Sequence, residues 1–256
     1  YAIKEAKKVG ETRVVYNSET NGHNHVPQNG TFESDANAKY LHYTSNNTIF
    51  GTQFQHVPKS NSTLICDMSS DILSRPINVS EFGVIYAGAQ KNMGPAGVTM
   101  VIIRKDLLEC SSENLPEVMN YSKVSAKGSM LNTPPVFPIY MVGLVAKHLL
   151  KLGGLEVMEK INTRKASRLY DFFGGSNGFY QGHARDDSRS KMNVTFRLPN
   201  EDLEKQFVEE ATQEQLLGLK GHRSVGGLRA SIYNAVPEES VNALVEFMLH
   251  FQQRCA

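Results

Sequence analysis

The sequence predicts an α/β fold in which a large sheet domain, residues 1–153, precedes a smaller C-terminal α+β domain, residues 154–256. Two observations carry this prediction. Short apolar runs, three of them continuous, recur before residue 104 and are typical of strands in a sheet that helices cover. In about the last hundred residues, helical patterns alternate with single strand patterns, as in a separate α+β unit.

The N-terminal part reads as one helix, one loop and five strands. Residues 1–10 resemble the end of a helix that Gly10 stops. Residues 17–38 are rich in Asn, Gly, Ser and Pro and predict a long surface loop. Predicted strands are 13–16, 40–43, 63–66, 84–87 and 98–103. The last three are continuous apolar runs, so we expect both faces of these strands to be covered.

Helices dominate the chain after residue 132, from the last helix of the large domain onwards. One is expected from Thr133-Pro134-Pro135 to Leu152, with Thr133 as its N-cap. Strands are predicted at 191–198 and 228–233, and further helices at 155–172, 201–215 and 237–252. The closing helix has one apolar face, made of Val241, Leu244, Val245, Met248 and Phe251.

Charge and cysteine content exclude several classes of partner. The 27 basic and 26 acidic residues form no block of like charge, so we expect neither nucleic acid nor a membrane surface as partner. Cys66, Cys110 and Cys255 form neither a disulfide framework nor a CxxC pair, which fits a reducing compartment. The expected location is therefore the cytoplasm, with an organelle as the alternative if a preceding segment carries a targeting signal. His23-x-His25 lacks further ligands of suitable spacing, so no metal site is predicted.

Two polar residues follow buried strands of the predicted sheet. Asp67 comes directly after the run 63–66, and Lys91 follows the run 84–87 through the turn Gly88-Ala-Gln90. Ligands of open α/β sheets bind at this carboxyl edge. Taken singly, a loop lysine is usually solvated and a strand-end aspartate usually caps a turn. Together they suit pyridoxal phosphate, since the lysine can form a Schiff base and the carboxylate can keep the pyridine nitrogen protonated.

An arginine loop lies further along the chain. His222-Arg223 and Arg229 flank Ser-Val-Gly-Gly-Leu, whose glycines permit a tight turn. Two guanidinium groups at one turn suit a substrate with two anionic groups, although surface arginines paired with acids are the default interpretation. His183, Arg185 and Arg189 show no comparable pattern and are interpreted as loop residues.

Long motifs resemble those of the phosphoserine aminotransferase family, a branch of the fold-type-I, aspartate aminotransferase-like enzymes. The motifs run nearly the whole chain: Cys66-Asp-Met-Ser-Ser70, Leu73-Ser-Arg-Pro-Ile77, Tyr86-Ala-Gly-Ala-Gln-Lys-Asn-Met-Gly-Pro-Ala-Gly97, Asn132-Thr-Pro-Pro135 and Lys220-Gly-His-Arg-Ser-Val-Gly-Gly-Leu-Arg-Ala-Ser-Ile-Tyr-Asn234. The resemblance implies pyridoxal 5'-phosphate as cofactor.

The resemblance also implies a role for each matching residue. Lys91 would bind the cofactor and move the proton between Cα and the cofactor, and Asp67 would pair with the pyridinium nitrogen. Thr48 would hydrogen-bond the phenolic oxygen, although Asn47 stands where relatives often have glutamate. Gln90 would contact the phosphate, and Asn132 and Thr133 would reach the phosphate in the partner subunit's site of a homodimer. For the substrate, Arg229 would hold the α-carboxylate, while His222 and Arg223 would help bind the phosphate.

The implied reaction is a two-step, ping-pong transamination. O-phospho-L-serine and 2-oxoglutarate would be converted to 3-phosphohydroxypyruvate and L-glutamate in serine biosynthesis, with 4-phosphohydroxy-L-threonine as a further substrate of some members. The family's N-terminal third, with its Gly-rich phosphate loop and stacking tryptophan, has no counterpart here. A truncated, non-catalytic fragment or assembly partner is therefore one alternative. Another fold-type-I enzyme, such as a cysteine desulfurase, is a second, but none of the three cysteines has a supporting motif.

Overall fold

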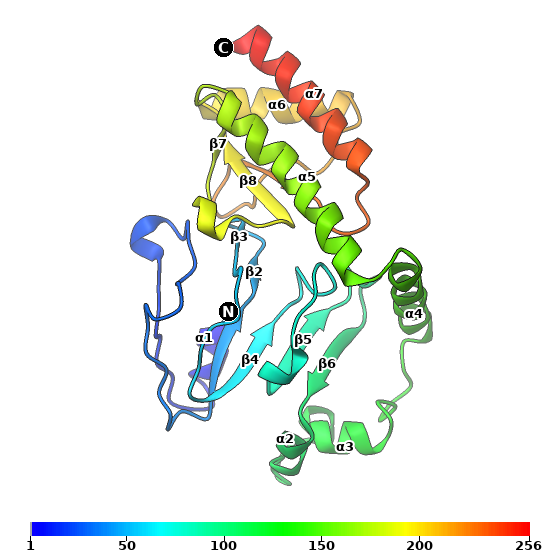
Figure 1. Ribbon diagram of the computed structural model, residues 1–256. Helices are drawn as coiled ribbons and strands as arrows, with labels where there is room; N and C mark the ends of the chain where they lie inside the picture. Colours follow the sequence, from blue (N-terminus) through cyan, green and yellow to red (C-terminus); the bar gives the residue numbers. More distant parts are fainter. Residues whose placement is uncertain (1) are drawn as a thin grey trace.

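A computed structural model describes residues 2–256, and its larger sheet lies in the first half of the chain. The sheet has the order β1-β4-β5-β6 (Figure 1). Its strands are β1 (Tyr40–Thr44), β4 (Thr63–Asp67), β5 (Val84–Gly88) and β6 (Thr99–Ile103). The strands predicted at 40–43, 63–66, 84–87 and 98–103 are thus confirmed.

The direction of these strands decides which residues meet. β1, β4 and β5 are parallel, and β6 is antiparallel to β5. The carboxyl ends of the three parallel strands therefore lie at one edge of the sheet. A small hairpin of β2 (Asn46–Asn47) and β3 (Thr52–Gln53) follows β1 at that edge.

Burial of the sheet is one-sided, so the prediction that both faces are covered was wrong. In β4 and β5 every second residue is buried, and β6 is half-buried or exposed along its length. The buried side chains pack against Met68, Ile72, Phe82 and Met93 from the connecting turns. Residues on the other face are only half-buried, because the described part of the chain provides no comparable layer there.

The segment before β1 is irregular. It contains α1 (Ala2–Ala6) and the short 3₁₀ helix η1 (Glu19–Asn21); Tyr1, part of the first predicted helix, lies outside the described residues. The strand predicted at 13–16 was wrong, since these residues pair with no other described strand. Tyr16 instead hydrogen-bonds His25, with 2.6 Å between its hydroxyl and Nε2. Four residues of apolar pattern do not specify a strand without a sheet edge beside them.

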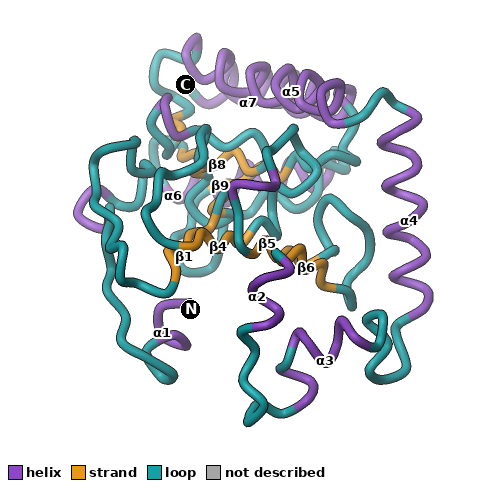
Figure 2. Tube along the Cα trace, turned by 60° about the horizontal axis from the view of Figure 1, so that its bottom comes forward, coloured by secondary structure: helices purple, strands orange, loops and turns teal. Residues whose placement is uncertain are grey.

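Helices after β6 lead to the second half. Three short elements follow β6: α2 (Lys105–Glu109), η3 (Glu117–Met119) and α3 (Tyr121–Ala126). Another short 3₁₀ helix, η2 (Val79–Glu81), lies earlier in the chain, between β4 and β5. The predicted long helix is α4 (Val136–Lys151), but its N-cap is Pro135 rather than Thr133. Helical geometry is disfavoured for a residue that precedes proline, so the helix starts only after Pro134 and Pro135. In Figure 2, α4 stands beyond the β6 end of the sheet.

The C-terminal part folds around a three-stranded antiparallel sheet of order β7-β8-β9. Its elements are α5 (Leu155–Gly175), β7 (Gln181–Gly182), η4 (Asp186–Ser188), β8 (Asn193–Arg197), α6 (Glu201–Gln213), β9 (Leu228–Ser231) and α7 (Glu238–Cys255). The five residues predicted for the apolar face of α7 are its buried residues. One core unites this half and a separate one fills the first half, whereas the predicted boundary at residue 153 stays a prediction.

Among residues 2–256, no single helix is both long and apolar enough to cross a membrane. α4 and α5 meet that criterion only together, across a bend of 86°.

Candidate active site

Three elements converge on Thr48. Lys91, in the turn after β5, donates from Nζ to Oγ1 of Thr48 at 3.0 Å. Arg229, on β9, donates from Nη1 to the backbone oxygen of Thr48 at 3.3 Å. The sequence separates these residues widely, yet the carboxyl edge of the large sheet and the strand β9 that follows the arginine loop bring them together.

The surroundings of Lys91 lower the pKa of its amine. Burial lowers the pKa of the amine, and Arg229 lowers it further, while Asp67 and Asp71 act in the opposite direction. The net shift is downward from the ordinary lysine pKa. A half-buried amine that loses its proton readily is suited to act as nucleophile and as proton carrier.

Asp67 ends β4 and lies beside two neutral groups. Tyr86 is its register partner on the neighbouring strand β5, and the phenol of Tyr86 hydrogen-bonds His42 Nε2 at 2.9 Å. Burial and the Asp67 charge raise the pKa of Tyr86 to about 12, and burial lowers the pKa of His42. The Asp67 carboxylate accepts from the backbone N–H of Ser69 at 2.9 Å.

A buried carboxyl group lies behind Asp67 and was missed by the sequence analysis. Asp71 accepts from the hydroxyl of Ser45 and, at 3.0 Å, from Nε2 of Gln53. Ser45 also donates its backbone N–H to the backbone carbonyl oxygen of Asp67 at 3.0 Å. Burial raises the pKa of Asp71. Nothing in the spacing of Asp67 and Asp71 signals that the second carboxyl is buried.

Cys66 precedes Asp67 and is fully buried. Burial raises the pKa of its thiol to about 12, so it is a core residue rather than a nucleophile.

Gln90 lies at the surface of the turn that carries Lys91. Its side chain folds over Gly88, because a Cβ placed on that glycine would lie 2.5 Å from Gln90 Oε1. The glycine thus makes room for the glutamine next to the lysine.

The arginine loop is a tight hairpin before β9. Gly221 N–H donates to Gly227 O at 2.8 Å, and Gly226 and Gly227 have φ of +68° and +67°. His222 Nδ1 contacts Ser224 Oγ at 2.7 Å. Arg223 is exposed and makes no ion pair within the described chain.

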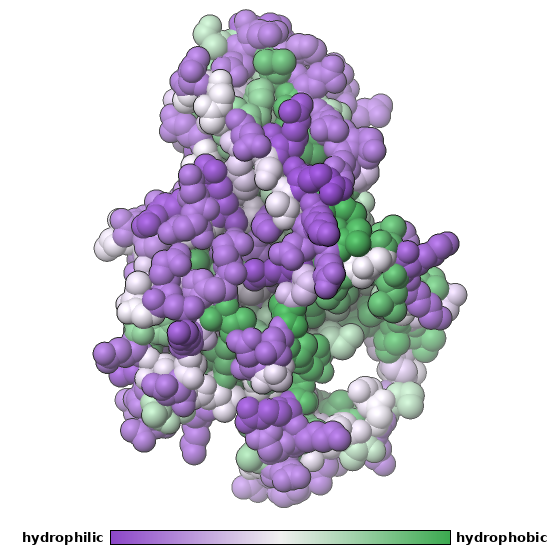
Figure 3. Space-filling view, viewed as in Figure 1, coloured by the Kyte–Doolittle hydropathy of each residue, from purple (hydrophilic) through white to green (hydrophobic). Residues whose placement is uncertain are grey.

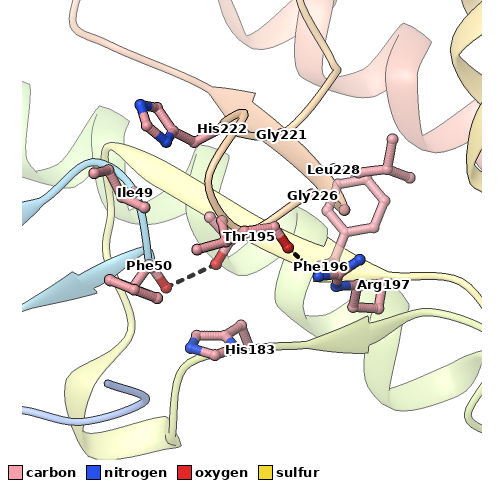
Figure 4. A pocket seen from close by; sticks show the side chains of 12 residues that line it. Ile49, Phe50, His183, Thr195, Phe196, Arg197, Gly221, His222, Gly226 and Leu228 are labelled. Atoms are coloured by element: carbon pink, nitrogen blue, oxygen red, sulfur yellow. Dashed lines mark hydrogen bonds between the residues drawn. The ribbon is translucent and has the colours of Figure 1, made fainter. Parts of the chain in front are cut away.

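A cleft separates this loop from the segment after β2 (Figure 4). His222 lines it opposite Ile49 and Phe50, and the Thr195 hydroxyl donates to Phe50 O at 2.8 Å. His183 also lines the cleft, although the sequence analysis left it as a loop residue. Its position depends on the β7–β8 hairpin, which no local pattern reveals.

Asn132 and Thr133 lie outside this cluster. Both side chains are exposed before α4, and neither forms a hydrogen bond among residues 2–256. The helix that they precede does reach the lysine turn, since a Cβ on Gly94 would lie 3.3 Å from Val142 on α4.

The residues at Thr48 fit pyridoxal phosphate. They offer an amine of lowered pKa, a strand-end carboxylate and a hydroxyl, which are the groups that this cofactor requires. In addition, Nε of Arg229 is buried and has no hydrogen-bond acceptor within the described residues. No three His, Cys, Asp or Glu side chains form a metal site in the described part of the chain.

Known proteins similar to this chain are aminotransferases. The sequence matches the class-V aminotransferase family over residues 1–244. It is 54% identical to phosphoserine aminotransferase of Desulfotalea psychrophila over 250 residues, which cover 98% of this chain and 69% of that protein. The corresponding protein of Desulfatibacillum aliphaticivorans is 56% identical over 256 residues, covering 99% of this chain and 70% of the relative.

Solved structures show the same likeness. Phosphoserine aminotransferase from Bacillus circulans subsp. alkalophilus superimposes with a TM-score of 0.97 at 52% identity, over all of this chain and 71% of that one. The pyridoxal-phosphate-bound enzyme from Trichomonas vaginalis gives 0.88 at 40% identity, over 97% and 71% of the two chains. A cysteine desulfurase from Thermococcus onnurineus, at 12% identity and a TM-score of 0.65, shares the fold alone. The chain therefore belongs to the class-V aminotransferases, pyridoxal-phosphate-dependent enzymes, and within them to the phosphoserine aminotransferases.

Proposed function

We propose that the chain transfers the amino group between O-phospho-L-serine and 2-oxoglutarate, forming 3-phosphohydroxypyruvate and L-glutamate. One observation carries the proposal: an amine of lowered pKa and a guanidinium group converge on Thr48, beside the carboxylate of Asp67. The names of relatives at 50–56% identity agree with it.

Bound pyridoxal phosphate supplies an aldehyde for covalent capture of amines and a ring that accepts electrons from the substrate Cα. The chain's residues do the rest. Lys91 would take the Cα proton as a general base and then, as an acid, deliver it to the C4′ carbon of the cofactor; its lowered pKa suits the first of these roles. Asp67 holds the proton on the ring nitrogen, and Thr48 orients the amine through its hydroxyl.

Two anionic groups of the substrate have separate binding positions. Arg229 lies next to Lys91 and has a free Nε, so it binds the α-carboxylate. His222 and Arg223 lie on the hairpin at the far side of the cleft and bind the phosphate. Gln90 contacts the cofactor phosphate from the lysine turn.

A homodimer completes the site in this proposal. Apolar side chains gather over α4 (Figure 3), where Val136, Phe137, Tyr140 and Leu150 are each more than 60% exposed. Patches of this kind mark protein interfaces. Asn132 and Thr133 precede α4, and in this proposal they contact the cofactor phosphate in the partner subunit's site.

The cellular role follows from the substrates. Serine biosynthesis is the proposed pathway, and 4-phosphohydroxy-L-threonine, which has the same two anionic groups, is a further proposed substrate. Cys66, Cys110 and Cys255 are all free, which supports the cytoplasm as the compartment.

The test is the visible absorption of the protein with pyridoxal phosphate, before and after O-phospho-L-serine. We expect absorption of bound cofactor that phosphoserine changes, and no such response in Lys91→Ala. Absorption that phosphoserine leaves unchanged would remove the substrate assignment. Absence of bound cofactor, with the intact mass of the chain confirmed, would contradict the proposal as a whole.

A further inference from the structure

Three asparagines, two of them buried and one half-buried, bind three consecutive carbonyl groups. Asn92 donates from Nδ2 to Ile72 O at 3.0 Å, Asn234 to Leu73 O at 2.8 Å, and Asn162 to Ser74 O at 3.1 Å. They are named here the asparagine clamp. Its members come from three places: the lysine turn, the segment after β9, and α5.

The clamped turn is held in an uncommon conformation. Leu73 has φ of +60°, a left-handed geometry that costs a side-chain-bearing residue on the order of 1 kcal/mol or more. Such a turn persists only where its surroundings fix it. The three amide groups provide that fixation, because each takes one carbonyl of the turn.

The clamp is also connected within itself. Asn92 Oδ1 accepts from the backbone N–H of Asn234 at 3.0 Å, and Asn162 Nδ2 donates to Asn234 Oδ1 at 2.8 Å. Asn92 and Asn162 are both buried, with 5% and 1% of their surface exposed. The network therefore joins the large sheet to the C-terminal half through buried and partly buried hydrogen bonds.

Its position relative to the site is the reason for the inference. Asn92 directly follows Lys91, and Asn234 follows β9, the strand that carries Arg229. Lys91 and Arg229 are long, flexible side chains, so the separation of their reacting groups depends on where their backbones are anchored. Thr48 fixes only the tips of the two side chains.

We propose that the asparagine clamp is a positioning device, in which Asn92, through Asn234, fixes the separation between the Lys91 amine and the Arg229 guanidinium. The clamp touches neither cofactor nor substrate. Its consequence for catalysis rests on the proposed function, whereas its effect on Lys91 does not.

The test compares Asn92→Leu with Asn120→Leu. Asn120 is also a buried asparagine; it caps α3, binds Ser112 O and forms no hydrogen bond with the clamp among residues 2–256. Both substitutions remove a buried amide network and are expected to lower Tm. With phosphoserine, we expect kcat/KM to fall at least about tenfold in Asn92→Leu and to stay within about twofold in Asn120→Leu.

A second readout uses the cofactor-free protein. The pH dependence of Lys91 acylation by acetic anhydride, followed by mass spectrometry, reports the pKa of its amine. Asp67, Asp71 and Arg229 are the charged groups that act on it. Loosening of the turn in Asn92→Leu exposes the amine and separates it from Arg229, so this pKa should rise towards its ordinary value, but not in Asn120→Leu.

If the pKa of the Lys91 amine is the same in Asn92→Leu as in the unchanged protein, the proposed positioning role of the clamp is wrong, whatever the activity. A changed titration in an enzyme that ignores phosphoserine would retain the clamp and remove the proposed function. If Asn92→Leu fails to fold, Asn92→Ala serves instead, because it also removes the donor to Ile72 O and adds no charge beside Lys91.

Discussion

The Lys91 amine gives up its proton more readily than a lysine in water, because burial and the Arg229 guanidinium both disfavour its ammonium form. Thr48 opposes this effect, since its hydroxyl accepts a hydrogen bond from the ammonium. The balance between these neighbours sets the fraction of free amine at a given pH. Single side chains around Lys91 therefore control the pH range of the reaction.

Thr48→Val removes the hydroxyl at nearly constant volume. Because a hydrogen bond to the charged form is lost, the pKa of Lys91 should fall further, and the acidic limb of kcat/KM should move to lower pH. Because the hydroxyl also orients the amine, we expect kcat/KM on the plateau of the pH profile to drop by about five- to tenfold, the equivalent of one hydrogen bond. Thr212→Val, which removes an exposed hydroxyl on α6, is the control. An unshifted pH profile would show that Thr48 does not act on the amine.

Individual site residues differ in how far the sequence reveals them. Asp67 and Lys91 follow apolar runs, so strand ends alone place them at one sheet edge. Thr48 and Gln90 carry no such signal and are indicated only by family resemblance. Asp71 and Asn92 were missed, because aspartate and asparagine are common in turns and their burial depends on contacts from distant segments.

At the scale of elements, the arginine hairpin requires glycine at position 221 because of lack of space for a side chain, and not because of a positive φ. A Cβ on Gly221 would lie 2.0 Å from Gly226 O and 2.6 Å from Gly227 O, which is far inside contact distance. The close approach of the two hairpin arms therefore requires glycine at this position.

Gly221→Ala should spread the hairpin and displace His222. We expect KM for O-phospho-L-serine to rise at least about tenfold, with a smaller change in kcat, because binding rather than the Lys91 chemistry is affected. Steady-state kinetics measures both. Gly174→Ala on α5, where an added Cβ meets nothing within 4 Å, should leave KM unchanged. Equal KM values in the two variants would contradict this account.

α5 holds the end of β9 through a buried lysine. Lys165 is 1% exposed, and its Nζ donates to the carbonyl oxygens of Ile232, Tyr233 and Val236 at 3.0, 2.8 and 2.9 Å. Lys165→Met would leave three carbonyl groups without a donor. We expect the free energy of unfolding to fall by about 3 kcal/mol, measured by urea denaturation. Lys160→Met, at an exposed position of α5, is the control and should change it little.

The pH dependence of stability provides a second measurement on the same residue. Burial lowers the pKa of Lys165 to about 8 from an ordinary 10.5. Between these values the unfolded chain binds more protons than the folded one, so this group makes the free energy of unfolding increase with pH. The slope between pH 8 and 10.5 should be smaller in Lys165→Met; an equal slope would mean that the lysine titrates normally.

Elements were predicted best where the pattern was long. The helices from 155, 201 and 237 and the strands of the large sheet appear close to their expected bounds, because periodicity and caps act locally. β2, β3 and β7 have only two residues each, too few for a pattern. The antiparallel direction of β6 follows from its hairpin connection to β5, which the sequence analysis did not address.

At the scale of the whole molecule, two cores are joined by a polar seam and flanked by an apolar surface. The cores lie on either side of the asparagine clamp, while α4 extends beyond the β6 end of the sheet. The half-buried sheet face and the exposed side of α4 could not be predicted, because a single chain's pattern does not distinguish packing within a molecule from packing between molecules.

Phe137→Glu tests the proposed dimer. This side chain is 66% exposed on α4, and a carboxylate there would be buried without a partner in an interface. We expect a shift from dimer to monomer at micromolar concentration, measured by analytical ultracentrifugation. Leu217→Glu, at a leucine that is 73% exposed outside α4, should leave the mass unchanged. A dimer in both variants would place the interface elsewhere.

Arg229 leaves one hydrogen-bonding group of the fold open to a ligand. Its buried Nε has no acceptor within the described chain, and a buried donor without acceptor lowers the free energy of unfolding by about 1 to 3 kcal/mol. An anion that accepts from Nε completes the fold as well as occupying the site. The melting temperature should therefore report on anion binding at Arg229. Carboxylates that fit Arg229 should raise the melting temperature in proportion to the logarithm of their concentration above Kd, and esters of the same acids should not.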